Sequence, residues 1–402
     1  MNKLHIDKTH WKKYRFDEVC RQVNEATKDP QAEGLDHVIG LEHIEPNNLH
    51  ITQWDTLEKE TTFTRKFRKG QVLFGRRRAY QRKVAYAEFD GICSGDILVF
   101  EAIEDVLLPE LLPFLTQSEG FFQKALATSA GSLSPRTKFK ELADYEFLLP
   151  PKAEQKRLAE LLWAADEVVE KEKREREALK VFKDRQMSYL LNGHQHIQNN
   201  GKPDDWERLT ISDLGIVSTS SVDKKQRPGE KIVSLINYMD VYTSKSKKIT
   251  SDIEFMQVTA PDKQIDNNQV NIGDILFTPS SETKDDIGHS AVVYEDLPNT
   301  LYSYHLVRLQ FNREIDLDFK RYLFNNPSTL AYFTKRAQGI TRMTLSLDDF
   351  NETPVLLPPL SEQKQIALKL SSIDSAIERI EKSIFFSQQI KQELIDKIFR
   401  HE

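Results

Sequence analysis

The chain has 402 residues, of which 39% are hydrophobic and 29% charged, and its formal net charge is −6. Its length fits two or three domains, and its composition is that of a soluble globular protein rather than a disordered one. No apolar run approaches the roughly 20 residues of a membrane-spanning helix, and the N-terminal segment lacks the apolar core of a signal peptide, so we expect a cytoplasmic location. Cys20 and Cys93 are the only cysteines, which indicates neither a disulfide framework nor a structural zinc site.

Residues 1–151 are expected to form a first domain of mixed strands and helices. Alternating apolar residues favour strands at 71–74, 83–87 and 96–100, and residues 109–127 favour a helix that is broken or bounded by prolines. No acidic residue lies between Glu60 and Glu88. That stretch holds nine basic residues, namely Arg65, Lys66, Arg68, Lys69, Arg76, Arg77, Arg78, Arg82 and Lys83. Local basic clusters of this kind, rather than the net charge, decide where a phosphate backbone would bind.

The chain contains a long internal repeat. The sequence Leu-Leu-Pro-Pro-Lys-Ala-Glu-Gln-Lys at 148–156 returns as Leu-Leu-Pro-Pro-Leu-Ser-Glu-Gln-Lys at 356–364, a displacement of 208 residues. Tryptophans at 11 and 206 open the two blocks, and Gly-Asp-Ile-Leu-Phe at 273–277 echoes Gly-Gln-Val-Leu-Phe at 70–74. The repeat predicts two similar units, with residues 205–358 as a second domain that includes a helix near 317–337.

Each proline pair is expected to lead into a long helix, one at 152–193, closed by Asn192-Gly193, and one at 359–402, capped by Ser361. A polar linker, 194–204, follows the first helix. Apolar residues at 4-3 spacing predict a coiled-coil seam, and polar slots within it would fix register; the alternative is two independent surface helices. The predicted pairing residues are Leu158, Leu162, Val169, Leu179 and Leu190 in the first helix and Ile366, Leu370, Ile373, Ile377, Ile380, Ile384, Leu394 and Ile398 in the second.

The order of domain, Pro-Pro-x-x-Glu-Gln-Lys, long helix, and then all three again resembles the specificity subunit of type I restriction-modification systems. Further support comes from Ile-Gly-Leu-Glu-His-Ile at 39–44 and Gly-Asp-Ile-Leu-Phe-Thr at 273–278. The resemblance covers essentially the whole chain. It implies an α+β fold in which two α/β target-recognition domains are separated by long helices that pair as an antiparallel coiled coil, with a pseudo-two-fold internal repeat.

The same resemblance implies a non-catalytic reader of double-stranded DNA. Each target-recognition domain would read one half of a split, asymmetric sequence, and the helices would act as a spacer and as a dock for two methyltransferase subunits that use S-adenosylmethionine. Restriction subunits that use ATP and Mg would join the larger complex, while this chain itself would hold no cofactor. Two readers on one face of B-DNA should lie about one helical turn apart, roughly 34–36 Å, and helices of about 40 residues, each roughly 60 Å long, can hold such a separation.

Candidate DNA contacts are the residues whose forked or bidentate groups suit base edges, together with basic neighbours that suit phosphates. Arginine geometry suits guanine, glutamine suits adenine, and Glu282 could accept from a cytosine amino group. In the first domain the candidates are Arg76, Arg77, Arg78, Tyr80, Gln81 and Arg82 in one loop and Ser132, Ser134, Arg136 and Lys138 in another. In the second domain they are Ser280, Ser281, Glu282, Thr283 and Lys284, followed by Thr341 and Arg342.

Motifs of independent catalysis or metal binding are missing from the sequence. It contains no phosphate-binding Gly-x-x-x-x-Gly-Lys-Ser/Thr loop and no Asn/Asp-Pro-Pro-aromatic methyltransferase motif. The nearest string to the latter, 325–328, is better interpreted as a helix end at an Asn-Pro turn. His194 and His196 lie in the polar linker, and 285–289 is best interpreted as a glycine turn, so no catalytic or metal-binding residue is expected.

Three alternatives stay open. A type IIB specificity subunit, which works beside a fused methyltransferase-nuclease, would share these motifs. A self-contained methyltransferase or nuclease would turn over by itself. A coiled-coil scaffold without DNA binding would show no salt-dependent DNA affinity.

Overall fold

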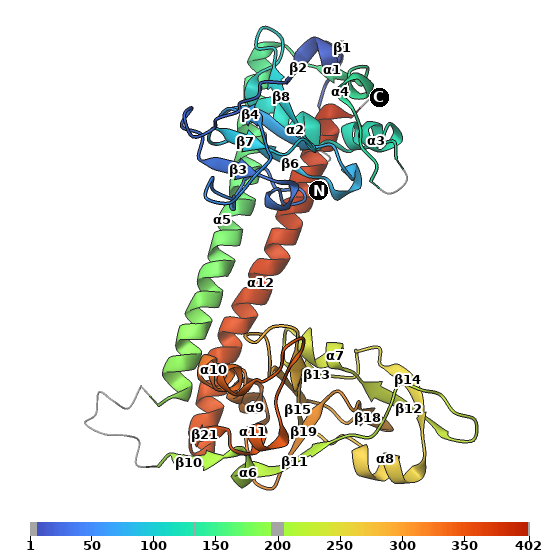
Figure 1. Cartoon of the computed structure of the whole chain (residues 1–402), viewed down its shortest axis with the longest axis vertical. Coiled ribbons are helices and arrows are strands. Elements are labelled where there is room, and N and C mark those ends of the chain that lie inside the picture. The colour runs from blue at the N-terminus through green and yellow to red at the C-terminus, as the bar shows by residue number, and fades with distance from the viewer. Residues whose placement is uncertain (1–5, 132–133, 194–204, 401–402) are drawn as a thin grey trace. The chain divides into compact units, whose positions relative to one another are not determined.

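The chain forms two compact units, shown in the computed structural model of Figure 1, which describes residues 6–131, 134–193 and 205–400. The described residues up to Lys173, together with those from Lys382 onward, make up the first unit, and Arg174 to Glu381 make up the second. Each unit contains a domain of mixed sheets and helices and a part of each of two long helices, α5 (Lys152–Leu191) and α12 (Leu360–Phe399). The expected α+β class with its doubled domain and helix is therefore confirmed.

Two sheets form the framework of the first unit. Its strands are β1 (Lys12–Arg15), β2 (Cys20–Val23), β3 (His37–Ile39), β4 (Arg65–Phe67), β5 (Val72–Gly75), β6 (Val84–Tyr86), β7 (Gly91–Cys93), β8 (Ile97–Ala102) and β9 (Glu146–Leu149). One sheet is antiparallel with the order β2-β8-β5-β6, and the other has the order β3-β7-β4 with β3 parallel to β7. The strands expected at 71–74, 83–87 and 96–100 are β5, β6 and β8, so these predictions are confirmed.

Short helices complete the first domain. They are α1 (Phe16–Val19), α2 (Leu112–Gln117), α3 (Glu119–Ala127) and α4 (Phe139–Leu142), with 3₁₀ turns η1 (Leu41–His43), η2 (Ala79–Gln81) and η3 (Pro109–Leu111). The helix expected at 109–127 is thus three pieces. It begins as η3 at Pro109 and is interrupted at Ser118, whose side chain caps α3 by accepting a hydrogen bond from the backbone N–H of Phe121.

The second unit repeats this framework with one change. Its strands are β10 (Glu207–Thr210), β11 (Gly215–Thr219), β12 (Lys231–Ile236), β13 (Lys248–Ile249), β14 (Met256–Ala260), β15 (Ile275–Phe277), β16 (Ser280–Ser281), β17 (Ser290–Val293), β18 (Thr300–Tyr302), β19 (Val307–Phe311), β20 (Met343–Thr344) and β21 (Pro354–Leu357). The sheet with the order β11-β19-β15-β17-β13 corresponds to the sheet β2-β8-β5-β6 of the first unit and has one additional strand, β13. The parallel pair β12 and β18 matches β3 and β7, but the third strand, β14, joins β12 at the opposite edge from β4.

The helices of the second domain are α6 (Ile211–Leu214), α7 (Tyr238–Tyr242), α8 (Asp262–Asn268), α9 (Leu317–Leu323), α10 (Pro327–Arg336) and α11 (Leu347–Asn351). The helix expected near 317–337 is interrupted between α9 and α10. Asn326 caps α10 by accepting a hydrogen bond from the backbone N–H of Thr329, and Pro327 occupies the first helical position. The Asn-Pro string therefore ends one helix and starts the next, as expected for a turn.

Aromatic rings fill the centre of each domain. In the first, the ring centroid of Phe74 lies 5.6 Å from Phe100 and 5.5 Å from Phe121. In the second, Phe277, at the position of Phe74 in the repeat, lies 5.2 Å from Phe324 and 6.2 Å from Phe333. Each aromatic core continues into the helix pair of its own unit, through Leu158, Leu162, Ile395 and Ile398 in the first and Leu190, Ile366 and Leu370 in the second. A fully buried aliphatic side chain of this size contributes about 1.5–3 kcal/mol relative to exposure.

The repeated Glu-Gln pair joins each domain to its helix. The indole N–H of Trp11 donates to Glu154, and that of Trp206 donates to Glu362, at 3.2 and 2.8 Å. The following glutamine is buried: Gln155 accepts from the backbone N–H of Leu108 and donates to the carbonyls of Val106 and Pro150, each at 2.9 Å.

Gln363 makes the equivalent contacts with the N–H of Asp316 and the carbonyl of Pro358, also at 2.9 Å. Antiparallel strand pairs, β1 with β9 and β10 with β21, close each domain directly before these residues. The repeat is therefore a structural clamp rather than an active site.

Within each unit the two long helices run antiparallel and are tied by an ion pair, which is buried in the first unit and half-buried in the second. In the first unit Lys391 donates to Asp166 at 2.8 Å, and the hydroxyl of Ser383 donates to Glu172 at 2.5 Å. In the second unit Lys183 forms an ion pair with Asp374 at 2.6 Å. Lys183 and Lys391 lie 208 residues apart, as do Asp166 and Asp374, so the ion pair repeats with the sequence.

The predicted pairing residues line these helices to different depths. Leu158, Leu162, Val169, Leu190, Ile366, Leu370, Ile384 and Ile398 are buried, whereas Leu179, Ile373, Ile377, Ile380 and Leu394 are half-buried. The predicted cap at Ser361 is wrong, because α12 begins at Leu360 and the carbonyl of Pro359 accepts from the backbone N–H groups of Glu362 and Gln363. At the other helix, Gly193 with φ of 68° follows the end of α5, as expected for a helix stop. The linker 194–204 lies outside the described residues.

None of the helices in the described part of the chain combines the length and apolar character that a membrane span requires.

Candidate nucleic-acid interface

The two loops predicted to contact DNA in the first domain meet each other. Arg77 follows β5, and its Nε donates to the hydroxyl of Ser134 at 2.6 Å. The backbone N–H of Arg78 donates to the carbonyl of Pro135 at 2.9 Å, and Arg77 forms an isolated antiparallel bridge with Arg136. Loops that are about 60 positions apart in the chain therefore form one surface, with basic side chains from both.

Asp96 holds this surface together, and it was not among the predicted residues. It lies in the turn before β8, where Arg136 donates from Nε to Oδ1 at 2.7 Å and from Nη2 to Oδ2 at 3.2 Å. Nη1 of Arg77 lies 3.5 Å from Oδ2 of the same carboxylate. The hydrogen bond from Arg136 is the main cause that lowers the pKa of Asp96, with Arg77 adding to it. A sequence signal existed in Ser-Gly-Asp at 94–96, a turn directly before a buried strand.

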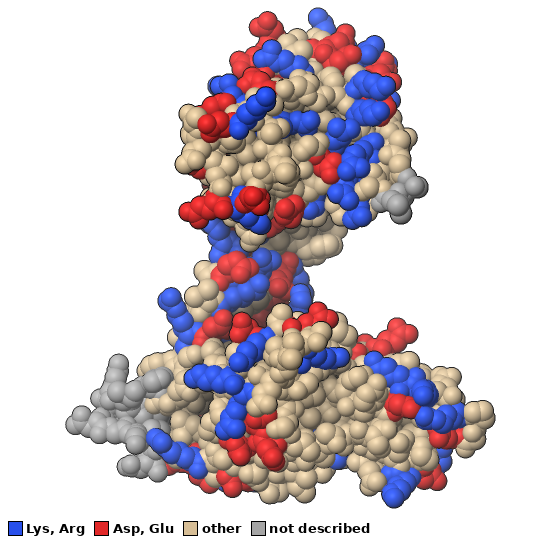
Figure 2. Space-filling view, in the orientation of Figure 1, with Lys and Arg blue, Asp and Glu red and all other residues tan. Residues whose placement is uncertain are grey.

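The other predicted residues of the first domain differ in exposure. Arg76 donates from Nε to the carbonyl of Thr137 at 3.1 Å, and partial burial lowers its pKa. The guanidinium of Arg82 makes contacts within the domain, because it pairs with Glu119 at 2.5 Å and lies over the ring of Phe122, 4.5 Å from its centroid. Tyr80 and Lys138 are exposed, Gln81 and Arg78 are half-buried, and Ser132 lies outside the described residues. Figure 2 shows Lys and Arg side chains gathered over α3 and α4 of this unit.

In the second domain the corresponding loops also meet, through a short ladder. β16 pairs with β20 so that Ser280 faces Thr344 and Ser281 faces Met343. The hydroxyl of Tyr238 donates to the carbonyl of Ser280 at 2.9 Å and so anchors the loop that begins at Ser280 to α7. Ser281 is buried, whereas Glu282, Thr283, Lys284, Thr341 and Arg342 are exposed. The exposed residues are thus carried on a rigid base.

His305 occupies the position in the second domain that Asp96 occupies in the first. The backbone N–H of Asp96 donates to the hydroxyl of Ser94 at 3.2 Å, and that of His305 donates to Ser303 at 3.3 Å, each just before the equivalent strands β8 and β19. Partial burial is the main cause that lowers the pKa of His305, and the charges of Lys224 and Arg342 lower it further.

Tyr304 extends this surface of the second domain, because its half-exposed ring lies 3.9 Å from that of His305. The sequence prediction missed Lys224, Tyr304 and His305, although the aromatic run Tyr-Ser-Tyr-His at 302–305 was a signal.

The cluster at 285–289 is a turn, as expected. Gly288 has φ of 79°, and His289 pairs with Asp286 at 2.6 Å. The hydroxyl of Tyr242 also donates to Asp286, at 2.5 Å, and this bond is the main cause that lowers the pKa of the Asp286 carboxyl. Both carboxylate oxygens of Asp286 are therefore used within the domain. His194 and His196 lie outside the described residues.

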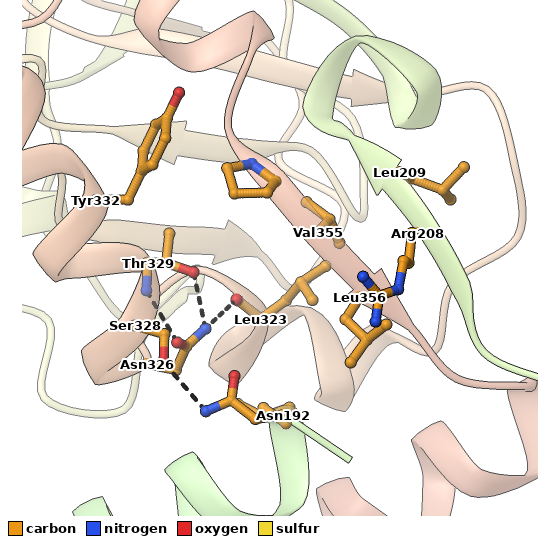
Figure 3. Close-up of a pocket in the computed structure, with 12 residues that line it drawn as sticks. Asn192, Arg208, Leu209, Leu323, Asn326, Ser328, Thr329, Tyr332, Val355 and Leu356 are labelled. Atoms are coloured by element: carbon orange, nitrogen blue, oxygen red, sulfur yellow. Dashed lines mark hydrogen bonds between the residues drawn. The ribbon is translucent and has the colours of Figure 1, made fainter. Parts of the chain in front are cut away.

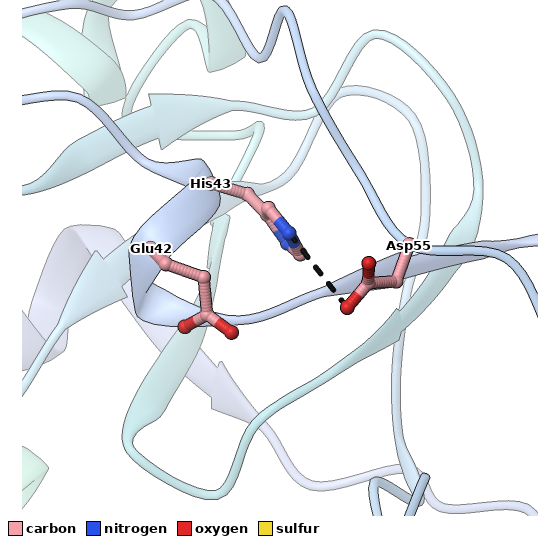
Figure 4. Close-up of side chains that lie close together, drawn as sticks. All are labelled: Glu42, His43 and Asp55. Atoms are coloured by element: carbon pink, nitrogen blue, oxygen red, sulfur yellow. Dashed lines mark ion pairs between the residues drawn. The ribbon is translucent and has the colours of Figure 1, made fainter. Parts of the chain in front are cut away.

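Glu42, His43 and Asp55 bring three potential metal-ligand atoms within 4.8 Å of one another (Figure 4). Nδ1 of His43 accepts a hydrogen bond from the backbone N–H of Gly40 at 2.9 Å, which places the proton of a neutral ring on Nε2. Nε2 lies 3.9 Å from Asp55, and Asp55 also pairs with Lys59 at 2.9 Å. The imidazole lone pair is therefore already used to hold η1, and the arrangement is that of a turn.

A pocket of about 360 Å³ lies at the end of α5 in the second unit (Figure 3). Asn192 donates to the hydroxyl of Ser328 at 3.1 Å on one side, and Asn326 donates to Leu323 and Thr329 beside it. The remaining walls come from β10, β21 and Tyr332. Its lining contains no carboxylate, histidine, lysine or cysteine.

Comparison with known proteins identifies one family. A family model described as "Type I restriction modification DNA specificity domain" matches residues 8–181 and again residues 203–385. The putative type I restriction enzyme MjaX specificity subunit of Methanocaldococcus jannaschii is 29% identical over 202 residues, which are 49% of this chain and 46% of that protein. The match thus spans about half the length of that relative. The type I restriction enzyme EcoKI specificity subunit of Escherichia coli K12 is 23% identical over 324 residues, which are 75% of this chain and 68% of that protein.

The fold is shared with a solved structure. A chain from work described as "Structural basis underlying complex assembly and conformational transition of the type I R-M system" superimposes with a TM-score of 0.61 and 17% identity over 97% of both chains. At this identity the likeness concerns the fold alone.

Proposed function

Because this chain belongs to the family of type I restriction-modification DNA specificity proteins, we propose that it is the DNA-recognition subunit of such a system and is itself non-catalytic. Each domain reads one half of a bipartite, asymmetric site on double-stranded DNA. The observation that carries this proposal is that the two domains share one backbone framework but present different side chains at equivalent positions. In both domains two distant loops meet beside a turn, but that turn presents Asp96 in the first domain and His305 in the second.

The chemistry of the two loop surfaces supports an asymmetric site. The first presents guanidinium groups, which match the acceptors of guanine, whereas the second presents hydroxyls, Glu282 and Arg342. Two surfaces of different hydrogen-bonding character favour different bases. A protein that reads two unlike half-sites requires a repeated framework whose DNA-contacting side chains differ between the two copies.

The helices support a spacing role. Each is an uninterrupted 40-residue helix, and one ion pair between them in each unit fixes their register. We infer that they hold the two readers at a set separation, since a helix resists bending far better than a loop.

Exposed apolar side chains on the helices support a docking role. Within the first unit, Phe386 and Ile390 lie four residues apart on α12, and Leu161 and Val168 lie seven apart on α5, so each pair shares a helix face. We infer that the helices dock two methyltransferase subunits, one for each repeat, which bind S-adenosylmethionine. Restriction subunits that use ATP and Mg complete the complex, and its DNA substrate places it in the cytoplasm.

A genome-wide methylation map tests the proposal. The chain would be expressed with its partner methyltransferase in cells without other adenine methylation, and methylated adenines would be mapped by single-molecule sequencing. We expect one bipartite motif, and replacing residues 6–149 by those of another family member should change only one half of it. An unchanged motif after the exchange would refute the assignment.

The same material separates the alternatives. A type IIB system is identified by a fused methyltransferase-nuclease encoded beside this chain. A self-contained enzyme would turn over S-adenosylmethionine or cut DNA without a partner. A scaffold would show no salt-dependent DNA affinity even in the complex.

A further inference from the structure

Asp96 and Arg136 form an oriented fork at the point where the two loops of the first domain meet. The carboxylate takes two hydrogen bonds from one edge of the guanidinium, the edge formed by Nε and Nη2, at 2.7 and 3.2 Å. A guanidinium group is planar and carries five N–H donors. One edge therefore points at Asp96, and the plane of the group is fixed by two bonds rather than one.

The opposite end of Arg136 stays available. Each terminal nitrogen, Nη1 and Nη2, carries two hydrogens, and Asp96 uses only one of those on Nη2. Nη1 donates a long hydrogen bond of 3.4 Å to the carbonyl of Ser134, and the side chain is 41% exposed. One hydrogen on Nη1 and one on Nη2 therefore remain as donors for a ligand. Guanine offers the matching pair of acceptors, O6 and N7, in the major groove, whereas no other base offers two acceptors there.

Arg77 braces the same carboxylate from its other side. Its Nη1 lies 3.5 Å from Oδ2 of Asp96, and its Nε is bonded to Ser134. Asp96 is only partly exposed and is surrounded by these two arginines, so its position is set by both loops together. The fork would lose its orientation if either the carboxylate or the meeting of the loops were lost.

We propose that Asp96 is a positioning residue that orients Arg136 to read a guanine in the half-site of the first domain. This inference rests on the proposed function and deepens it. The second domain lacks this device, because His305 stands at the position of Asp96 and Arg342 has no carboxylate from that turn to brace it. We therefore expect a guanine contact by a carboxylate-braced arginine only in the half-site read by the first domain.

Two substitutions test the fork in the complex with the partner methyltransferase. Arg136→Lys keeps the charge and loses the planar fork, and Asp96→Asn keeps the shape and weakens the brace. We expect the wild-type half-site to contain one guanine at which both variants lose discrimination by roughly tenfold or more, while every other position of the motif stays unchanged. Loss of stability alone would lower methylation of all sites equally and would not relax one position.

Arg21→Lys is the matched control. Arg21 in β2 also pairs through Nε and Nη2 with a carboxylate, that of Glu101 in β8, but on a strand pair away from the loops. Its variant should leave the motif unaltered.

A measurement on the wild-type complex covers the case in which the variants do not fold. Substituting 7-deazaguanine, which lacks the N7 acceptor, at the guanines of the half-site assigned by domain exchange should slow methylation at one of them by tenfold or more. Any of three results would overturn the proposal that Asp96 orients Arg136 to read a guanine. They are a half-site without guanine, full activity on every 7-deazaguanine substrate, and an unchanged motif in both folded variants. Absence of any bipartite motif in the wild type would instead overturn the proposed function.

Discussion

Lys391 and Asp166 form an ion pair at 2.8 Å between α12 and α5, and both side chains are at least 94% buried. His50 donates to the second oxygen of the same carboxylate at 2.7 Å, which connects the first domain to the helices. In the second unit the carboxylate is Asp374, and its partner on the domain side is not a histidine: Arg321 and the hydroxyl of Tyr322 contact it at 3.2 and 2.6 Å. The helix pair is thus symmetric, while its attachment to each domain is not.

Breaking the first ion pair from one side should be costly. Lys391→Met leaves the buried Asp166 with His50 as its remaining partner, and we expect the first unit to lose about 3–5 kcal/mol of unfolding free energy. The double variant Asp166→Leu with Lys391→Met should recover most of that loss, because neither charge is then buried unpaired. Urea unfolding of the full chain, followed by the fluorescence of a unit-specific tryptophan, measures both. Equal losses in the single and double variants would contradict this account.

Stability of the first unit should depend on pH through His50. The hydrogen bond to Asp166 is the main cause that raises the pKa of His50, and the charges of Asp166, Glu88 and Glu170 add to it. Because its pKa is higher in the folded state, protonated His50 stabilises the folded unit, and this stabilisation is fully present below the ordinary pKa of 6.5. The stabilisation is lost as pH rises through the folded-state pKa. The unfolding free energy of the wild type should therefore fall as pH rises from 6.5 through the folded-state pKa of His50.

The variant His50→Gln isolates that effect. Glutamine does not titrate, so the first unit of this variant should show a flatter pH profile, measured by urea unfolding at each pH. An identical slope in wild type and variant would assign the pH dependence to other groups.

The repeated glutamines should be worth different amounts. Gln155→Ala leaves three backbone groups without their partner, and we expect a loss of about 2–4 kcal/mol. Gln363→Ala removes two such bonds and should cost less. Hydrogen exchange should locate the loss at the N–H of Leu108 in the first unit and of Asp316 in the second. If exchange at these amides is unaffected, the clamp does not hold the loops.

DNA binding should couple to protonation of His305. Burial, Lys224 and Arg342 lower the pKa of this group in the free protein. A phosphate placed between these cations would raise it, so the complex should take up a proton and its affinity should fall as pH rises through the pKa in the complex. Fluorescence anisotropy of the full complex between about pH 5.5 and 8 measures this effect.

The variant His305→Gln should remove that dependence. His289→Gln serves as the control, because His289 is engaged by Asp286 within the domain. A pH dependence that survives in His305→Gln but not in His289→Gln would place the titrating group elsewhere.

Periodicity and repetition were sufficient to predict the frame. The alternating apolar runs at 71–74, 83–87 and 96–100 are β5, β6 and β8, because apolar alternation of this kind is typical of a half-buried strand. The doubled Pro-Pro-x-x-Glu-Gln-Lys string gave the two helix starts, since proline excludes helix before it and tolerates helix after it. The prediction of a cap at Ser361 failed because the helix begins at Leu360, so that Ser361 lies inside its first turn, and a helix start can shift by one or two residues without changing the apolar pattern.

The sequence by itself determined the family, the two domains and the two long helices, because these depend on local preferences and on a repeat visible along the chain. Only the tertiary structure decided which polar residues act together. Asp96 lies 40 positions from Arg136, and Asp166 lies 225 from Lys391, so no local pattern links them. Their partnership exists because burial forces each charge to find a counter-charge, and the fold alone fixes which one is within reach.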